Sequence, residues 1–174
     1  SKENRLCSLI LNGKDRPIKI ELQNFLKESG DTPGTRKTFI YNTFEKLMKA
    51  ISKSLKKNDP NHLNLGIRYG YIEQLDDELL RISKESFDAL SFNCYALSPD
   101  HEKMNHALEI SGLPMIIGEY HFGTVDRGLA QSLWQVNSQK ERGDAFRYYT
   151  ENAFAHRGLI GTGWFRWIDQ NLNG

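Results

Sequence analysis

The chain has 174 residues, enough for one domain with a sizeable hydrophobic core. Its 23 Lys and Arg residues nearly balance its 22 Asp and Glu residues, giving a net charge of +1, so nucleic acid is not an expected partner. No run of roughly 18 apolar residues is present, which argues against a membrane-spanning segment. The sequence shows no N-terminal signal sequence. The compartment of the parent protein therefore stays open, and a secreted or periplasmic location is one alternative.

Neither cysteine nor histidine patterns indicate a metal site. Cys7 and Cys94 lie far apart and form no motif, which also argues against a disulfide scaffold. The five histidines show no paired ligand spacing of the HExxH type; His101 and His106 are five residues apart, which does not align them on one helical face. We therefore expect no metal ion and no cofactor.

Residues 1–60 are predicted to be mainly helical. The first 16 residues are ambiguous. Pro17 suits a first helical turn, and apolar residues recur after it at helical spacing as far as Gly30. A longer amphipathic helix is predicted after Pro33. Its apolar face is expected to consist of Ile40, Phe44, Leu47, Met48, Ile51 and Leu55.

From residue 61 onward, strands and helices are predicted to alternate. The expected strands cover residues 62–69, 87–95, 115–119 and 159–164. The expected helices cover residues 75–84, 100–111 and 137–155, with 121–136 as a long loop. In the last helix the residues expected to face inward are Phe146, Tyr149, Ala153 and Phe154. Alternation at this spacing implies an α/β fold built from parallel βα units.

Each predicted strand ends in polar or aromatic residues. These ends are Arg68-Tyr69, then Asn93 and Tyr95, then Glu119 to His121, then Trp164 to Trp167. Sites form at this end of the strands in α/β sheets, and chemistry at four successive ends favours a barrel over a flavodoxin-like sheet. No glycine-rich phosphate loop follows a strand, which argues against nucleotide binding.

A closed eight-stranded barrel needs roughly 200 residues or more, and four strands are half of its sheet. We therefore predict that residues 1–174 are a single partial domain, the C-terminal half of a TIM barrel. Residues 1–60 would be its helical lead-in, and residues 61–174 its four βα-type units.

The segment Pro114–Gly123, PMIIGEYHFG, carries the strongest functional signal. Three apolar residues run into a glycine, the Glu119 carboxylate and two aromatic residues. A buried strand that presents one carboxylate among rings is a common way to build a site that cleaves sugars. The alternative is a core strand that leads into an acid-containing turn.

The runs PMIIGEYHFGTVDRG, SQKERGDAFRYYTENAFAH and GTGWFRWIDQ together resemble the β-agarase family of glycoside hydrolases. They are more distantly similar to the β-galactosidases of the same large (β/α)8 clan. DPNHLNLGIRYG and FDALSFNCYA resemble the two preceding strands of that family. The resemblance implies that the four strands are the fifth to eighth of the barrel and that Glu119 is the catalytic nucleophile of a retaining enzyme.

The same resemblance implies that the acid/base carboxylate follows the fourth strand in an Asn-Glu pair. This chain contains no such pair, since Glu151-Asn152 is reversed and lies within a predicted helix. We therefore expect the chain to hold one of the two catalytic carboxyl groups and to be inactive in isolation.

The candidate substrate-binding residues surround Glu119 at the predicted strand ends. Tyr95 is a candidate hydrogen-bond donor to Glu119, and His121 is expected to face the site if Tyr120 does not. The resemblance makes Trp164 the ring against which a sugar packs. Arg68 could join the site or pair with a structural carboxylate such as Asp88. The full candidate set is Asn93, Tyr95, His121, Trp164, Trp167, Asp169 and Gln170. The alternatives are that Tyr95 is a core tyrosine, that His121 is an ordinary loop histidine and that Trp164 is a core tryptophan.

Three functions remain open at this point. The first is part of a retaining glycoside hydrolase that cleaves galactose-containing glycans. The second is a carbohydrate-binding barrel without catalysis. The third is a structural half-barrel that completes its sheet by dimerisation. The expected partners are a glycan and either the missing N-terminal half-barrel or a second copy of the chain.

Overall fold

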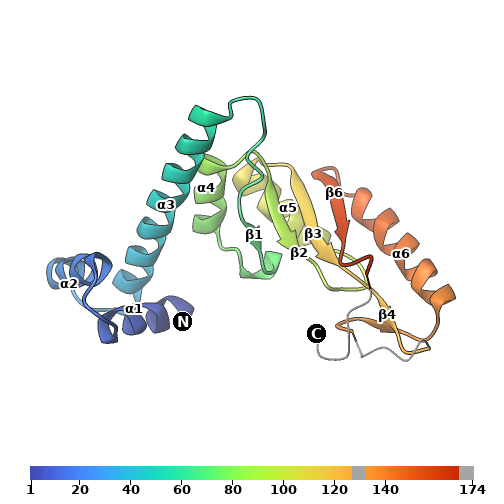
Figure 1. Cartoon of the computed structure of the whole chain (residues 1–174), viewed down its shortest axis with the longest axis horizontal. Coiled ribbons are helices and arrows are strands. Elements are labelled where there is room, and N and C mark those ends of the chain that lie inside the picture. Colours follow the sequence, from blue (N-terminus) through green and yellow to red (C-terminus); the bar gives the residue numbers. More distant parts are fainter. Residues whose placement is uncertain (127–131, 169–174) are drawn as a thin grey trace. The chain divides into compact units, whose positions relative to one another are not determined.

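The computed structural model describes residues 1–126 and 132–168. The chain divides into two compact units, residues 1–54 and 55–174 (Figure 1). None of the described helices is both long and apolar enough to cross a membrane. The first unit contains helices only, whereas the second contains the sheet.

The first unit is formed by α1 (Lys2–Asn12), α2 (Pro17–Ser29) and most of α3 (Pro33–Asn58). Of the ambiguous residues 1–16, Lys2–Asn12 form α1, and Ser1 caps this helix, its hydroxyl accepting a hydrogen bond from the Asn4 N–H. The core of this unit is formed by Cys7, Leu22, Leu26 and Phe39, with Ile10, Leu11, Ile18, Phe25 and Ile40 packed around them.

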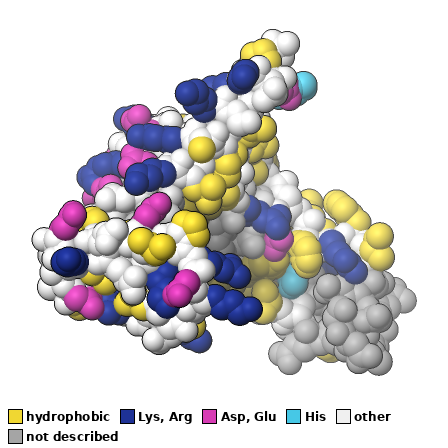
Figure 2. Space-filling model, turned by 60° about the vertical axis from the view of Figure 1, so that its left-hand side comes forward, with side chains coloured by type: hydrophobic (Ala, Val, Ile, Leu, Met, Phe, Trp, Pro, Cys, Tyr) yellow, Lys and Arg dark blue, Asp and Glu magenta, His cyan; other side chains and the backbone are white. Residues whose placement is uncertain are grey.

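The predicted apolar face of α3 is wrong in part. Met48 is buried and Ile40 packs on the core, but Leu47, Ile51 and Leu55 are exposed. The core that α3 shares with α1 and α2 includes Phe39 and Ile40, which lie near the start of α3. Figure 2 shows a face of the molecule on which hydrophobic side chains lie among many Lys and Arg side chains.

The second unit contains a four-stranded parallel sheet in the order β1-β2-β3-β6. These strands are β1 (Arg68–Tyr69), β2 (Leu90–Asn93), β3 (Met115–Tyr120) and β6 (Leu159–Trp164). The elements between them are the 3-10 helix η1 (Ile72–Gln74), α4 (Asp77–Ser86), α5 (His101–Ser111) and α6 (Gln139–Phe154). The predicted parallel α/β class is confirmed.

Two of the predicted strands are too long. β1 was expected to begin at residue 62, but Gly66 has φ +72°, a left-handed conformation that interrupts an extended strand. β2 begins later than expected because Phe87 still caps α4, its N–H donating to Ser83 O. The predicted loop 121–136 also contains a small parallel pair, β4 (Gly123–Thr124) and β5 (Gln135–Val136).

Burial alternates along the central strands, so one face of the sheet carries the core. Leu90 and Phe92 in β2 and Met115 and Ile117 in β3 are fully buried, whereas their neighbours are less so. In α6, Tyr149 and Ala153 are buried as predicted, but Phe146 is 38% exposed and Phe154 is 51% exposed. Tyr149 and Ala153 share a face at i, i+4, and the next residue turns away from it.

Candidate active site

Glu119 lies near the carboxyl end of β3, in the interior of the sheet. The pairing of β2 with β3 shifts register between Phe92 and Asn93, so that Asn93 lies opposite Glu119 instead of Gly118. This irregularity places an amide side chain beside the carboxylate. The Glu119 side chain is 14% exposed.

Three donors from the neighbouring strand ends converge on the Glu119 carboxylate. Arg68 Nη2 lies 2.6 Å from Oε1. Asn93 Nδ2 donates to Oε2 at 3.0 Å, and the Tyr95 hydroxyl donates to the same oxygen at 2.6 Å. The expected Tyr95–Glu119 contact is confirmed. A carboxylate can accept all three bonds at once through its two oxygens.

Arg68 reaches Glu119 by crossing the sheet beside Gly118. A Cβ atom at Gly118 would clash with Arg68 Cδ and lie 3.1 Å from Ser91 Oγ. Because glycine has no side chain, the Arg68 stem can occupy this position. The alternative pairing of Arg68 with Asp88 is wrong, since Asp88 Oδ2 accepts the Asn64 N–H at 2.7 Å.

Tyr95 is held as a neutral donor. Burial raises the pKa of its phenol, and the hydrogen bond to the Glu119 carboxylate raises that pKa further. Asn93 has a fixed amide orientation, because only its NH₂ group can donate to a carboxylate. Its Oδ1 is buried and has no hydrogen-bond partner among the described residues.

His121 lies beside Tyr95, with ring centroids 5.0 Å apart. Its Nδ1 lies 2.8 Å from the Phe165 carbonyl oxygen, and its Nε2 accepts the Leu133 N–H at 3.3 Å. Since a carbonyl only accepts, the proton is on Nδ1 and the ring is neutral. Burial lowers the pKa of His121, which favours the same neutral form.

Tyr120 and His121 have different surroundings, and a role of His121 in the site stays a prediction. Tyr120 is 1% exposed and stacks on Tyr149 of α6, with ring centroids 4.1 Å apart. Its side chain therefore belongs to the core beneath α6. His121 is the residue that contacts Tyr95.

Trp164 ends β6 and belongs to an aromatic cluster against α6. Its ring centroid lies 5.3 Å from that of Tyr120 and 5.5 Å from that of Phe146, and the Arg142 guanidinium lies over it at 5.3 Å. Trp167 lies at the edge of this cluster and is 83% exposed. The sugar-binding roles of Trp164 and Trp167 stay predictions. Asp169 and Gln170 lie outside the described residues.

Trp134 contacts Tyr95, although it is not among the candidate site residues predicted from the sequence. Its indole N–H donates to the backbone oxygen of Tyr95, 39 positions earlier in the chain. The signal available in the sequence was a tryptophan in the connection that follows the Glu119 strand. Its partner, a main-chain carbonyl, leaves no trace in the sequence.

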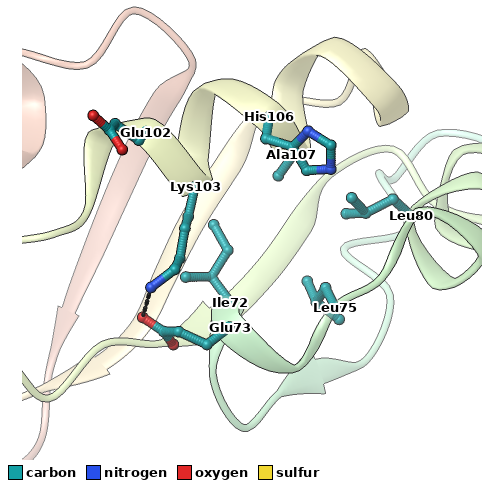
Figure 3. Close-up of a pocket in the computed structure, with 8 residues that line it drawn as sticks. All are labelled: Ile72, Glu73, Leu75, Leu80, Glu102, Lys103, His106 and Ala107. Atoms are coloured by element: carbon teal, nitrogen blue, oxygen red, sulfur yellow. Dashed lines mark ion pairs between the residues drawn. The ribbon is translucent and has the colours of Figure 1, made fainter.

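A separate pocket of about 300 Å³ lies between η1, α4 and α5 (Figure 3). Its apolar lining comes from Ile72, Leu75, Leu80 and Ala107, and its charged lining from Glu73, Glu102, Lys103 and His106. Lys103 lies 3.6 Å from Glu73, and His106 lies 2.8 Å from Asp77. These charges of both signs select no ligand class. Within residues 1–126 and 132–168, no group of three or more His, Cys, Asp or Glu side chains is placed to hold a metal ion.

The chain is similar in sequence to two curated proteins of Vibrio sp. (strain JT0107). It is 32% identical over 130 residues to Beta-agarase A and 30% identical over 135 residues to Beta-agarase B. The matches cover 71% and 74% of this chain, but only 13% and 14% of those proteins. The chain therefore spans a small part of the length of the curated relatives that it matches. No family model matches it.

Solved structures of agarases are also similar to this chain. The crystal structure of the agarase AgWH50C matches 95% of this chain and 26% of its own, with a TM-score of 0.78 and 27% identity. The structure of an exo-beta-agarase matches 81% of this chain and 19% of its own, with a TM-score of 0.72 and 25% identity. The predicted resemblance is thus confirmed in sequence and in fold, and the chain is similar to a segment of β-agarases.

Proposed function

We propose that this chain supplies the nucleophile side of a retaining glycoside hydrolase that acts on agarose or a related galactose-containing glycan. Glu119 is the nucleophile. The observation that carries the proposal is the convergence of Arg68, Asn93 and Tyr95 on its two oxygens. The substrate class is taken from the names of the relatives, which are agarases.

The geometry suits nucleophilic attack on an anomeric carbon. In a retaining mechanism one carboxylate forms a covalent glycosyl-enzyme while a second carboxyl group, about 5–5.5 Å away, protonates the leaving oxygen. Asn93 and Tyr95 both bind Oε2, whereas Arg68 is the partner that the described residues give Oε1, so Oε1 keeps a lone pair for attack. The fixed donors orient the carboxylate and remain in place while its charge passes into the new bond.

The proton donor belongs to a different part of the parent barrel. We propose that the parallel strands β1, β2, β3 and β6 are the fifth to eighth of a (β/α)8 barrel and that residues 1–60 lead into them. The order of the sheet and the small share of the agarase chains that this chain matches support this arrangement. The other half-barrel is the proposed partner, and the chain alone does not cleave agarose. A second copy pairing along a sheet edge is the competing arrangement, which light scattering on the purified chain distinguishes.

An activated substrate tests Glu119 without the missing acid. The reagent 2,4-dinitrophenyl 2-deoxy-2-fluoro-β-galactoside has a leaving group that needs no proton, and its fluorine slows hydrolysis of the covalent intermediate. Mass spectrometry of the peptides should find one fluorogalactosyl group on Glu119. Glu119→Gln should remain unlabelled, whereas Glu109→Gln, on the exposed face of α5, should label like the wild type. Labelling of another carboxylate, or of none, would refute the proposal.

A further inference from the structure

We infer that Trp134, which directly precedes β5, is a sugar-stacking residue of this site. This inference rests on the proposed function and deepens it, because it assigns a binding surface for a neutral glycan to a residue with no role in the proposed chemistry.

Trp134 is fixed at both its backbone and its ring. Its carbonyl oxygen accepts the Gly123 N–H at 2.8 Å and the Ser132 hydroxyl at 2.6 Å. Its indole N–H donates to the backbone oxygen of Tyr95. Since the N–H of a tryptophan is its only polar group, this bond satisfies the side chain completely and sets the direction of the ring.

Trp134 as a residue is nevertheless 38% exposed. Trp164 packs against the rings of Tyr120 and Phe146. Trp134 instead combines a satisfied polar edge with an accessible apolar surface. A fixed, partly exposed aromatic ring next to hydrogen-bonding groups suits a ligand with an apolar face and polar edges, and a pyranose ring has both.

Trp134 is also connected to the Glu119 carboxylate by hydrogen bonds through a single residue, Tyr95. Tyr95 accepts the Trp134 indole N–H at its carbonyl and donates its own hydroxyl to Glu119. The neighbouring Leu133 N–H donates to His121, whose ring contacts Tyr95. His121 is thus a positioning residue, which holds the Leu133–Trp134 segment against the same tyrosine that orients Glu119.

Three variants separate stacking from general loosening of the loop. Trp134→Ala removes the ring, and Trp134→Phe keeps a ring but removes the N–H that binds Tyr95. Leu133→Ala is the matched control, because this adjacent side chain is 67% exposed and its backbone N–H to His121 is retained. Thermal unfolding of each variant, followed by circular dichroism, confirms that it is folded.

Binding of agarose oligosaccharides is measured by calorimetry, and labelling of Glu119 by the fluorogalactoside is scored separately. We expect about tenfold weaker binding for Trp134→Ala, a smaller loss for Trp134→Phe and no change for Leu133→Ala. The inference is overturned if Trp134→Ala binds like the wild type, if Leu133→Ala loses as much, or if the wild type does not bind. In each case the labelling of wild-type Glu119 decides the proposed function independently.

Discussion

The two ends of the sheet use polar side chains in different ways. At the amino end, Asp88 accepts the Asn64 N–H at 2.7 Å, and Asn64 bonds with Ser86 O and Gly66 N–H, both at 3.0 Å. Every one of these partners is a backbone group. At the carboxyl end, the partners of Glu119 are the side chains of three other residues. The Asp88 carboxylate therefore stabilises local backbone structure, whereas the Glu119 carboxylate is held by side chains at the end of the sheet where sites form in α/β folds.

The largest expected effect contrasts Glu119 with Asp88. Glu119→Gln should lower the rate of labelling by the fluorogalactoside at least about a thousandfold, because an amide is a poor nucleophile. Asp88→Asn should leave labelling intact but lower the free energy of unfolding by about 1–3 kcal/mol, because the Asn64 N–H loses its charged carboxylate acceptor. Peptide mass spectrometry and urea unfolding measure the two quantities. The contrast fails if both variants lower the labelling rate, or if both lower the free energy of unfolding.

A glycine at each end provides a second contrast. Gly66→Ala should lower the free energy of unfolding by about 1–3 kcal/mol, because Gly66 has φ +72° and its Cβ would press on the Phe87 ring. Gly118→Ala meets the Arg68 side chain, which can move aside. It should therefore leave stability nearly unchanged and slow labelling of Glu119 about tenfold, through loss of the ion pair. Normal labelling of Gly118→Ala would show that Arg68 has no part in orienting Glu119.

Two tyrosines sharpen the comparison further. Tyr95→Phe removes a hydrogen bond to Glu119 and should slow labelling several-fold to about tenfold. Tyr69→Phe removes a partly buried hydrogen bond of 2.8 Å between the Tyr69 and Ser83 hydroxyl groups. It should lower the free energy of unfolding by about 1 kcal/mol and leave labelling unchanged. Equal labelling rates in the two variants would contradict the proposed role of Tyr95.

The smallest expected effect is a pH dependence carried by one histidine at each end. Burial lowers the pKa of both His121 and His156. The unfolded chain protonates each ring near pH 6.5, whereas the folded chain does so only at lower pH. The unfolded state then binds more protons, so the free energy of unfolding should fall as the pH drops below about 6.5.

The two histidines differ in their surroundings. His121 faces Arg142, Glu119 and Tyr95, whereas His156 faces His101 and Arg157. His121→Gln should therefore abolish a pH-dependent change in Trp134 fluorescence, because protonation of His121 breaks its bond to Leu133. His156→Gln should flatten the stability curve alone. An unchanged fluorescence titration in His121→Gln would contradict this assignment.

The sequence predicted the parts of this molecule that depend on local pattern. The apolar run before Glu119 predicted β3, and β6 was predicted with its observed bounds. The limits of β1 were wrong because Gly66 is left-handed, and a glycine adopts extended and left-handed conformations with similar ease. The β4–β5 pair was missed because two residues in each strand give no periodicity.

The site was predictable to a similar depth. Glu119 and Tyr95 were identified from their places at strand ends, where side chains converge in a parallel sheet. The contact of Arg68 with Glu119 could not be predicted, because it depends on the space above Gly118. The anchoring of Trp134 depends on a carbonyl group, which every residue has.

The role of Glu119 is tested most directly by chemical rescue of Glu119→Gly with azide and 2,4-dinitrophenyl β-galactoside. A nucleophile replaced by glycine leaves space on the face opposite the leaving group, and a single displacement by azide inverts the anomeric carbon. We predict that the product is α-galactosyl azide. Formation of the β-azide, or of no azide product, would contradict the assignment of Glu119 as the nucleophile.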